Sequence, residues 1–144
     1  MAAAATLSAA QGAPPPDLSA MAAKARVSGR LVTWCRGQFR SGRSNAYAAA
    51  VTSPGGGGRY LVLDRDALMM ELAPYKDAPD LSCYTPAEAR TLNETVRSSE
   101  TISGGIAPAF PTTVVCAFVE DTRATCWQYS PASRTFVKVG EWQT

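Results

Sequence analysis

TTVVCAFV, residues 112–119, is a nearly continuous run of apolar and β-branched side chains. The polar residues 120–123 interrupt it, and two further β-rich runs follow at 124–129 and 135–142, separated by the turn sequence SPAS at 130–133. These runs predict a three-stranded antiparallel meander. Because the first run lacks polar alternation, we expect it to be a central strand that is covered on both faces.

An earlier part of the chain carries a second group of β-rich runs, at residues 30–35, 46–52, 59–63 and 67–72. The proline and glycines of residues 53–58 are typical of a hairpin loop. The alanines of 46–52 favour a helix by intrinsic propensity, but we expect a strand because the neighbouring segments are strands. The group therefore predicts a second meander.

Two segments have the pattern of helices. TPAE at residues 85–88 is a capping box with proline at the first helical position, and it predicts a helix that runs to about residue 98. Asp17 predicts the N-cap of an earlier helix over residues 18–28, with Gly29 as its left-handed stop. The order helix, strands, helix, strands is typical of an α+β fold.

The pattern predicts one domain. We expect residues 17–144 to form a single α+β domain with an antiparallel sheet of about six to seven strands in two meanders and one or two packed helices. Residues 1–16, rich in alanine and proline, are expected to be a disordered tail left after removal of a signal peptide, and residues 74–82 and 101–111 to be loops. The side chains expected in the core are Leu61, Leu92, Val96, Val115, Phe118, Trp127 and Val137.

The four cysteines contain no CxxC pair, which favours disulfides over a metal site and implies an oxidising compartment. We expect two bonds, Cys35–Cys83 and Cys116–Cys126. The second bond requires a hairpin centred on Asp121, which places its two cysteines opposite each other. A hairpin with only two loop residues would direct them to opposite faces, and they would then have to pair with the other two cysteines.

The composition argues against several chemistries. The chain has no histidine, which removes the commonest general base and the commonest transition-metal ligand. The glycines at 55–58 are followed by a strand instead of a helix beginning Gly-Lys-Ser/Thr, so they do not predict a phosphate-binding loop. Asp64, Asp66 and Glu71 are the nearest carboxylate cluster, and acids beside a turn are typical of a solvated turn. We therefore predict no catalytic residues, no metal and no cofactor.

Positive charge is concentrated in the first half of the chain. The net charge is only +2, but residues 18–63 contain seven basic side chains and no acid. Such asymmetry favours either an anionic partner or two halves whose charges are solvated on separate faces. The candidate ligand-binding residues belong to a basic loop rich in glycine and serine; they are Arg36, Arg40 and Arg43, with Trp34 and Phe39 beside them. Guanidinium groups bind phosphate and carboxylate through paired donors, and the alternative is a solubilising loop without a partner.

Two resemblances add to this reading. WQYSPASRTF, residues 127–136, resembles one strand–turn–strand of a kelch repeat. A single unit implies a hairpin and not a propeller. The chain as a whole resembles small exported proteins of Gram-negative bacteria, which implies a bacterial source and an extracytoplasmic location.

These features predict an exported, non-enzymatic binding or interaction module, periplasmic or secreted. Its expected partner is an unknown protein or an anionic envelope component such as lipid headgroups or polysaccharide. Nucleic acid is not expected, because the domain is only weakly basic. No run of about 18 strongly apolar residues predicts a transmembrane segment, and we expect a monomer. The alternative is a hydrolase with an acid-only or serine-based site that lacks histidine.

Overall fold

The computed structural model describes residues 12–40, 46–64, 69–75, 80–119 and 123–144 of the 144-residue chain. The elements in chain order are α2 (Pro16–Lys24), β1 (Arg30–Gly37), β2 (Ala46–Thr52), β3 (Gly58–Leu63), β4 (Met69–Tyr75), β5 (Asp80–Tyr84), α3 (Pro86–Ser98), β6 (Ser103–Ile106), β7 (Val114–Val119), β8 (Arg123–Ser130) and β9 (Thr135–Gln143). They form a small α+β domain with two antiparallel sheets, so the predicted fold class is confirmed.

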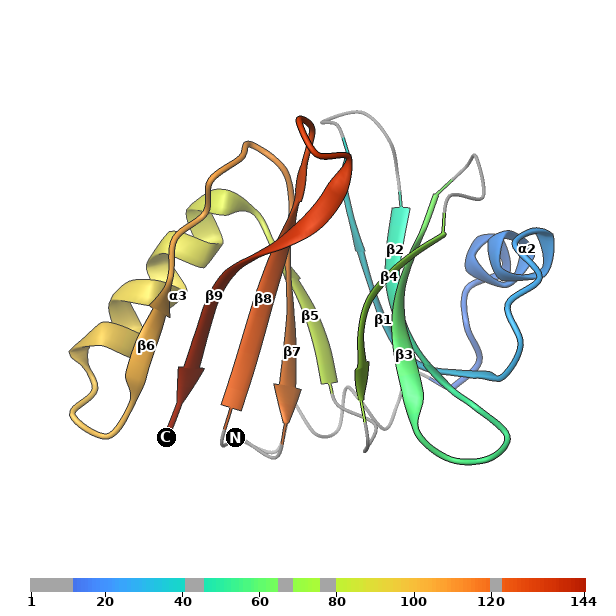
Figure 1. Ribbon diagram of the computed structural model, residues 1–144, viewed down its shortest axis with the longest axis horizontal. Helices are drawn as coiled ribbons and strands as arrows, with labels where there is room; N and C mark the ends of the chain where they lie inside the picture. The colour runs from blue at the N-terminus through green and yellow to red at the C-terminus, as the bar shows by residue number, and fades with distance from the viewer. Residues whose placement is uncertain (1–11, 41–45, 65–68, 76–79, 120–122) are drawn as a thin grey trace.

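The domain has four layers (Figure 1). Helix α3 covers the outer face of a five-stranded sheet with the order β5-β7-β8-β9-β6. The inner face of that sheet packs against a four-stranded sheet with the order β1-β2-β3-β4, whose outer face carries α2. The four-stranded sheet is one meander and β7 to β9 form the other, as the sequence predicts.

Strand β2 shows how neighbouring strands decide the conformation of an alanine-rich segment. It pairs with β1 along one edge and with β3 along the other. Ala48, Ala49 and Ala50 are fully buried, so both faces of the strand are covered. The preference of alanine for a helix is worth only about 0.7 kcal/mol per residue, and pairing and burial along the whole segment outweigh it. The expected strand is confirmed.

Strand β7 is an interior strand, as TTVVCAFV predicts. It lies between β5 and β8. Val115 packs between the two sheets, whereas Val114 and Cys116 pack on the side of α3, and all three are fully buried. Both faces are apolar because both are covered, and this explains the missing alternation. Leu61 and Trp127 are also buried, as expected.

Three side chains expected in the core are only partly buried. Phe118 lies near the end of β7, where its ring packs edge-on against Trp142 at a centroid distance of 5.6 Å. Val137 lies near the turn that precedes β9 and is likewise half-buried. On α3, Val96 is buried and Leu92 is partly buried against the same cluster. Side chains near the ends of the strands in the five-stranded sheet are therefore less buried than those in the middle of the strands.

Two short strands lie in segments that the sequence predicts to be loops. Strands β5 and β6 pair with β7 and β9, and they form the two edges of the five-stranded sheet. The sequence of β6 is SGGI, which has low strand propensity, but the backbone N–H of Ile106 donates to Asn93 Oδ1 of α3 at 2.8 Å. Gly104 has a φ of 109°, and a side chain there would collide with the carbonyl of Glu141. Tertiary contacts thus form β6, and the described chain has nine strands instead of six to seven.

Helix α2 begins differently from the prediction. Pro15 occupies the N-cap position without a side-chain hydrogen bond, and Pro16 is the first helical residue. Asp17 lies in the first turn, where its carboxylate accepts a hydrogen bond from Tyr47 instead of capping the helix. The structure describes residues 12–16, which were expected to belong to the disordered tail, whereas residues 1–11 of that tail lie outside the described residues. The tertiary contact with Tyr47 replaces the local cap.

The C-terminal end of α2 also differs from the prediction. The helix ends at Lys24, four residues before the expected end at 28. Arg26 adopts a left-handed φ of 57°, and this conformation terminates the helical turn. Gly29 has a φ of 104°, but it serves the entry into β1, where a side chain would collide with the carbonyl of Thr52 in β2.

Helix α3 agrees with the prediction. Thr85 Oγ1 accepts a hydrogen bond from the Glu88 N–H at 3.1 Å, and Glu88 Oε1 accepts one from the Thr85 N–H at 2.8 Å. The capping box, with Pro86 at the first helical position, satisfies two backbone donors that the helix itself cannot pair. The helix then runs to Ser98, as expected.

Both predicted disulfides are present. Cys116 and Cys126 are directly paired between β7 and β8 with Cα atoms 4.1 Å apart, which is the register centred on residue 121; we call this bond the hairpin disulfide. Cys35 of β1 and Cys83 of β5 form a bond between the two sheets, which we call the inter-sheet disulfide. In the chain-entropy model the two bonds contribute about 3 and about 4 kcal/mol. Two such bonds indicate a protein of an oxidising environment.

Candidate functional site

The structure separates the residues that the sequence predicts as a ligand-binding set. Arg36 belongs to β1, which continues two residues beyond the predicted end of that strand. Phe39 is fully buried between the sheets, with its ring centroid 6.1 Å from that of Phe136, so it is a core side chain. Trp34 is half-buried on the opposite face of the four-stranded sheet, in the cluster that contains α2. Arg43 lies outside the described residues.

Arg36 is held in a network with Asp17 and Tyr47. Its guanidinium Nη2 donates to Tyr47 Oη at 2.7 Å and to Asp17 Oδ2 at 3.2 Å. The Tyr47 hydroxyl in turn donates to Asp17 Oδ1 at 3.0 Å. The three residues come from β1, α2 and β2, so the network attaches the first turn of α2 to the four-stranded sheet. Arg36 therefore has an acidic partner and a structural role.

The network shifts the pKa of both charged groups. Desolvation acts to raise the pKa of Asp17, but the hydrogen bonds from Tyr47 and from the Leu18 N–H, together with the charge of Arg36, outweigh it and hold the pKa below the ordinary value of 3.8. The hydrogen bond with Tyr47 is the largest of the causes that raise the pKa of Arg36. Both groups are therefore charged at neutral pH.

Arg40 is also neutralised. Its Nη2 lies 2.6 Å from Asp64 Oδ2, and the Asp64 side chain is only 3% exposed whereas that of Arg40 is 34% exposed. Within the described ranges Asp64 is the one buried acidic residue. A buried carboxylate is strongly unfavourable without a cation beside it. Arg40 therefore stabilises the contact between the segments that follow β1 and β3.

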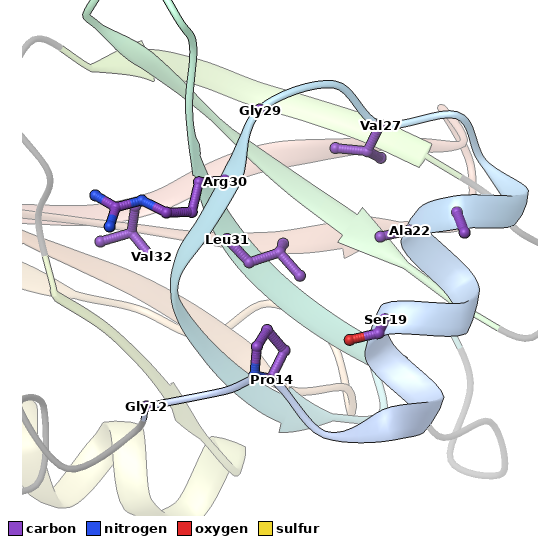
Figure 2. A pocket seen from close by; sticks show the side chains of 10 residues that line it. Gly12, Pro14, Ser19, Ala22, Val27, Gly29, Arg30, Leu31 and Val32 are labelled. Atoms are coloured by element: carbon purple, nitrogen blue, oxygen red, sulfur yellow. The ribbon is translucent and has the colours of Figure 1, made fainter.

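A hollow of about 660 Å³ lies between α2, the loop that follows it and the start of β1, and this feature has no counterpart in the sequence predictions. Figure 2 shows five side chains directed toward the space enclosed by these segments; they are Pro14, Ser19, Ala22, Val27 and Leu31. Four of the five are apolar, and the hydroxyl of Ser19 is the polar group on the wall formed by α2. The remaining lining residues include Gly12, Gly29 and Arg30, so polar groups line the hollow as well.

The hollow exists because the segments around it carry small side chains and change direction. Ala22 and Ala23 leave space between α2 and β1, and the register of β1 against β2 shifts by one residue at Val32. Such a bulge bends an edge strand and reorients its side chains. The only sequence signal for the hollow is the pair of alanines, which equally fits a close contact between a helix and a sheet.

Three basic side chains lie between the last turn of α2 and the start of β1, and we call them the basic rim: Lys24, Arg26 and Arg30. They lie in the last turn of α2, in the loop after it and at the first position of β1, and all three are exposed. Arg30 lines the hollow, although its side chain leaves β1 on the side opposite Leu31 (Figure 2). Within the described ranges no acid forms an ion pair with any of the three. The basic rim therefore carries exposed positive charge in the same segments of the chain that surround the hollow.

The carboxylates considered for acid–base catalysis are not assembled into a site in the part of the chain that the structure describes. Asp64 is paired with Arg40, whereas Asp66 and the side chain of Glu71 lie outside the described residues. The described Cys, Asp and Glu residues form no group of three or more that could hold a metal ion.

Comparison of the chain with known protein families, with curated proteins and with solved structures finds no match. In the described part of the chain, no helix has both the length and the apolar character needed to cross a membrane.

Proposed function

We propose that the protein is an exported binding module, periplasmic or secreted, that contacts an anionic component of the cell envelope and catalyses no reaction. The observation that carries the proposal is the basic rim, three exposed cations within residues 24–30 that no described acid neutralises. The two disulfides support the exported location, because such bonds persist in oxidising compartments.

The proposed contact surface, the basic rim, differs from the basic loop that the sequence predicts. Arg36 and Arg40 already have carboxylate partners at 3.2 and 2.6 Å, so a ligand would have to compete with Asp17 and Asp64 for them. The basic rim has no such competition among the described residues. Near an anionic lipid surface each cation contributes about 1 kcal/mol, so three cations give a weak and reversible attachment.

The test compares two variants that change the net charge equally. The site variant replaces the basic rim by glutamine: Lys24→Gln, Arg26→Gln and Arg30→Gln. The control variant replaces three exposed cations elsewhere: Arg90→Gln, Arg97→Gln and Arg134→Gln. Arg97 lies in the last turn of α3 as Lys24 does in α2, and Arg134 has a left-handed φ of 54° that matches the 57° of Arg26. Each variant lowers the net charge from +2 to −1.

Both variants and the parent are eluted from a sulfonate matrix with a gradient of sodium chloride. We expect the site variant to elute at clearly lower salt than the control variant, because clustered charges act together at distances below the Debye length of about 8 to 10 Å. Equal elution of the two variants would contradict the proposal, since retention would then follow net charge alone.

A further inference from the structure

We infer that the inter-sheet disulfide is a site of reversible thiol exchange, at which a small thiol attacks Cys83 and forms a mixed disulfide with it. The hairpin disulfide stays closed under the same conditions. The inference does not rest on the proposed function, because it involves no residue of the basic rim.

The two disulfides differ in their access to solvent. Cys116 and Cys126 are fully buried, whereas Cys35 and Cys83 are both partly exposed. Cys83 also lines a second hollow, of about 220 Å³, between the end of β1 and the segment that joins β5 to α3; we call it the junction hollow. Cys35 is not among the described residues that line it. Because exposed disulfides are the labile and regulatory ones, we expect exchange at the inter-sheet bond, with the attack on Cys83.

The exchange needs no reagent besides the thiol. The thiolate of the small molecule attacks Cys83 Sγ, the new S–S bond forms as the bond to Cys35 Sγ breaks, and Cys35 leaves as a thiolate that takes a proton from water. Re-attack by Cys35 expels the small thiol and restores the original bond. If a second small thiol attacks the mixed disulfide instead, the two small thiols are oxidised to their disulfide and both cysteines are reduced.

The place where the two sheets meet is also held by contacts that do not involve the disulfide. The Gln38 N–H donates to Thr113 Oγ1 at 2.9 Å, and the Thr113 N–H donates to the Gln38 carbonyl at 3.0 Å. Gln38 follows β1 and Thr113 precedes β7, so the pair connects the two sheets. Phe39, fully buried between the sheets, adds an apolar contact next to Gln38. We therefore expect the sheets to stay together after the bond opens, which keeps Cys35 close enough to re-attack.

Two cysteine variants test which sulfur is accessible. Cys35→Ser leaves Cys83 as a free thiol, Cys83→Ser leaves Cys35 free, and both keep the hairpin disulfide. Each variant is incubated at pH 8 with hydroxyethyl disulfide, a small uncharged reagent, and the mass increase from the mixed disulfide is followed over time. We expect Cys83 to react at least tenfold faster than Cys35, because Cys83 lines the junction hollow and Cys35 does not. Near-ultraviolet circular dichroism checks that both variants are folded.

The parent protein gives a second measurement that removes no cysteine. It is equilibrated with 2-mercaptoethanol and hydroxyethyl disulfide at a series of ratios, quenched with acid and mapped by mass spectrometry. We expect the inter-sheet bond to open at a thiol-to-disulfide ratio at least tenfold lower than the hairpin bond. The trapped mixed disulfide should lie on Cys83, and the near-ultraviolet circular dichroism should be preserved.

A pair of tryptophan variants tests the route through the junction hollow. Gln38→Trp enlarges an exposed side chain that lines the hollow, and Ala87→Trp places the same side chain at an exposed position of α3 that does not line it. Gln38→Trp should slow the attack of 2-mercaptoethanol on the inter-sheet bond at least fivefold by blocking access, and Ala87→Trp should leave the rate unchanged.

Three results would contradict the inference. A mixed disulfide on Cys35, equal rates for the two free cysteines, or opening of both bonds at one ratio with loss of tertiary structure would make the inter-sheet disulfide a purely structural bond. An unchanged rate in Gln38→Trp would overturn the route through the junction hollow. Because the reagents are uncharged, all of these outcomes leave the salt-dependent contact of the basic rim to its own test.

Discussion

Gln128 of β8 offers a direct test of how the five-stranded sheet is held together. It is fully buried, and its side-chain amide makes four hydrogen bonds to the segment that leads into β7. Its Oε1 accepts from the N–H groups of Ala109 at 2.8 Å and Phe110 at 3.3 Å. Its Nε2 donates to the carbonyls of Phe110 and Thr112, both at 2.8 Å. We predict that Gln128→Leu, which keeps the volume and removes all four bonds, destabilises the protein.

The loss of stability expected for Gln128→Leu depends on how exposed the hydrogen-bond partners of Gln128 are. Four hydrogen bonds at a net value of about 1 kcal/mol each set a nominal loss of about 4 kcal/mol. Ala109 is exposed and Phe110 is partly exposed, so water can replace part of what their backbone groups lose. Thr112 is only 6% exposed, so its carbonyl would stay unsatisfied, whereas the leucine gains about 1 to 2 kcal/mol by burial. The expected net loss of stability is about 2 to 4 kcal/mol.

The measurement is urea unfolding followed by tryptophan fluorescence with both disulfides intact. Gln38→Leu, at an exposed position, is the matched control and should change the free energy of unfolding by less than about 0.5 kcal/mol. Gln128→Glu should lose more than Gln128→Leu at neutral pH, because a carboxylate oxygen would face the two carbonyls that now accept from Nε2. A loss below about 1 kcal/mol for Gln128→Leu at an unchanged m value would refute the reasoning, and strand pairing alone would then hold the segment.

Three further predictions follow from the network, the ion pair and the disulfides. Arg40→Met should cost about 2 to 4 kcal/mol in urea unfolding, because it removes the cation that lies 2.6 Å from the buried carboxylate of Asp64; an unchanged midpoint would contradict this. Under limiting phosphine, peptide mapping after alkylation should find the inter-sheet disulfide reduced before the hairpin disulfide, because the cysteines of the first are partly exposed and those of the second are fully buried. The pKa of Asp17 is lower in the folded chain than in the unfolded chain, so its contribution is complete above about pH 4 and is lost as the pH falls through the folded pKa. The protection factors of the α2 amides, which are exchange rates corrected for their intrinsic pH dependence, should therefore fall below about pH 4 in the parent and should lose this pH dependence in Asp17→Asn.

Elements whose causes are local could be predicted from the sequence. The capping box at 85–88 and the run at 112–119 determine their structures through neighbouring residues and through their own apolarity. The hairpin disulfide was predictable as well, because the register of a single β-hairpin decides which two cysteines face each other.

Elements that depend on distant partners were missed. The glycines of β6 have low strand propensity, and the strand exists because β9 pairs with it and Asn93 accepts its Ile106 N–H. Asp17 has the sequence context of an N-cap, but Tyr47, 30 residues away, donates to its carboxylate. In both cases the deciding hydrogen bond joins residues whose proximity the sequence does not reveal.

The candidate site also combines a feature that the sequence reveals with one that depends on distant partners. The sequence reveals a stretch from 18 to 63 with seven cations and no acid, but not which of those cations remain free. The two acids that border the stretch, Asp17 and Asp64, fold back and neutralise Arg36 and Arg40, the cations that the sequence marks most clearly. Among the described residues, the fully exposed cations of this stretch without an acidic partner are then those of the basic rim, between the early end of α2 and the start of β1. A charge pattern therefore predicts that an anionic partner is plausible, whereas the tertiary pairing of the bordering acids determines where such a partner can bind.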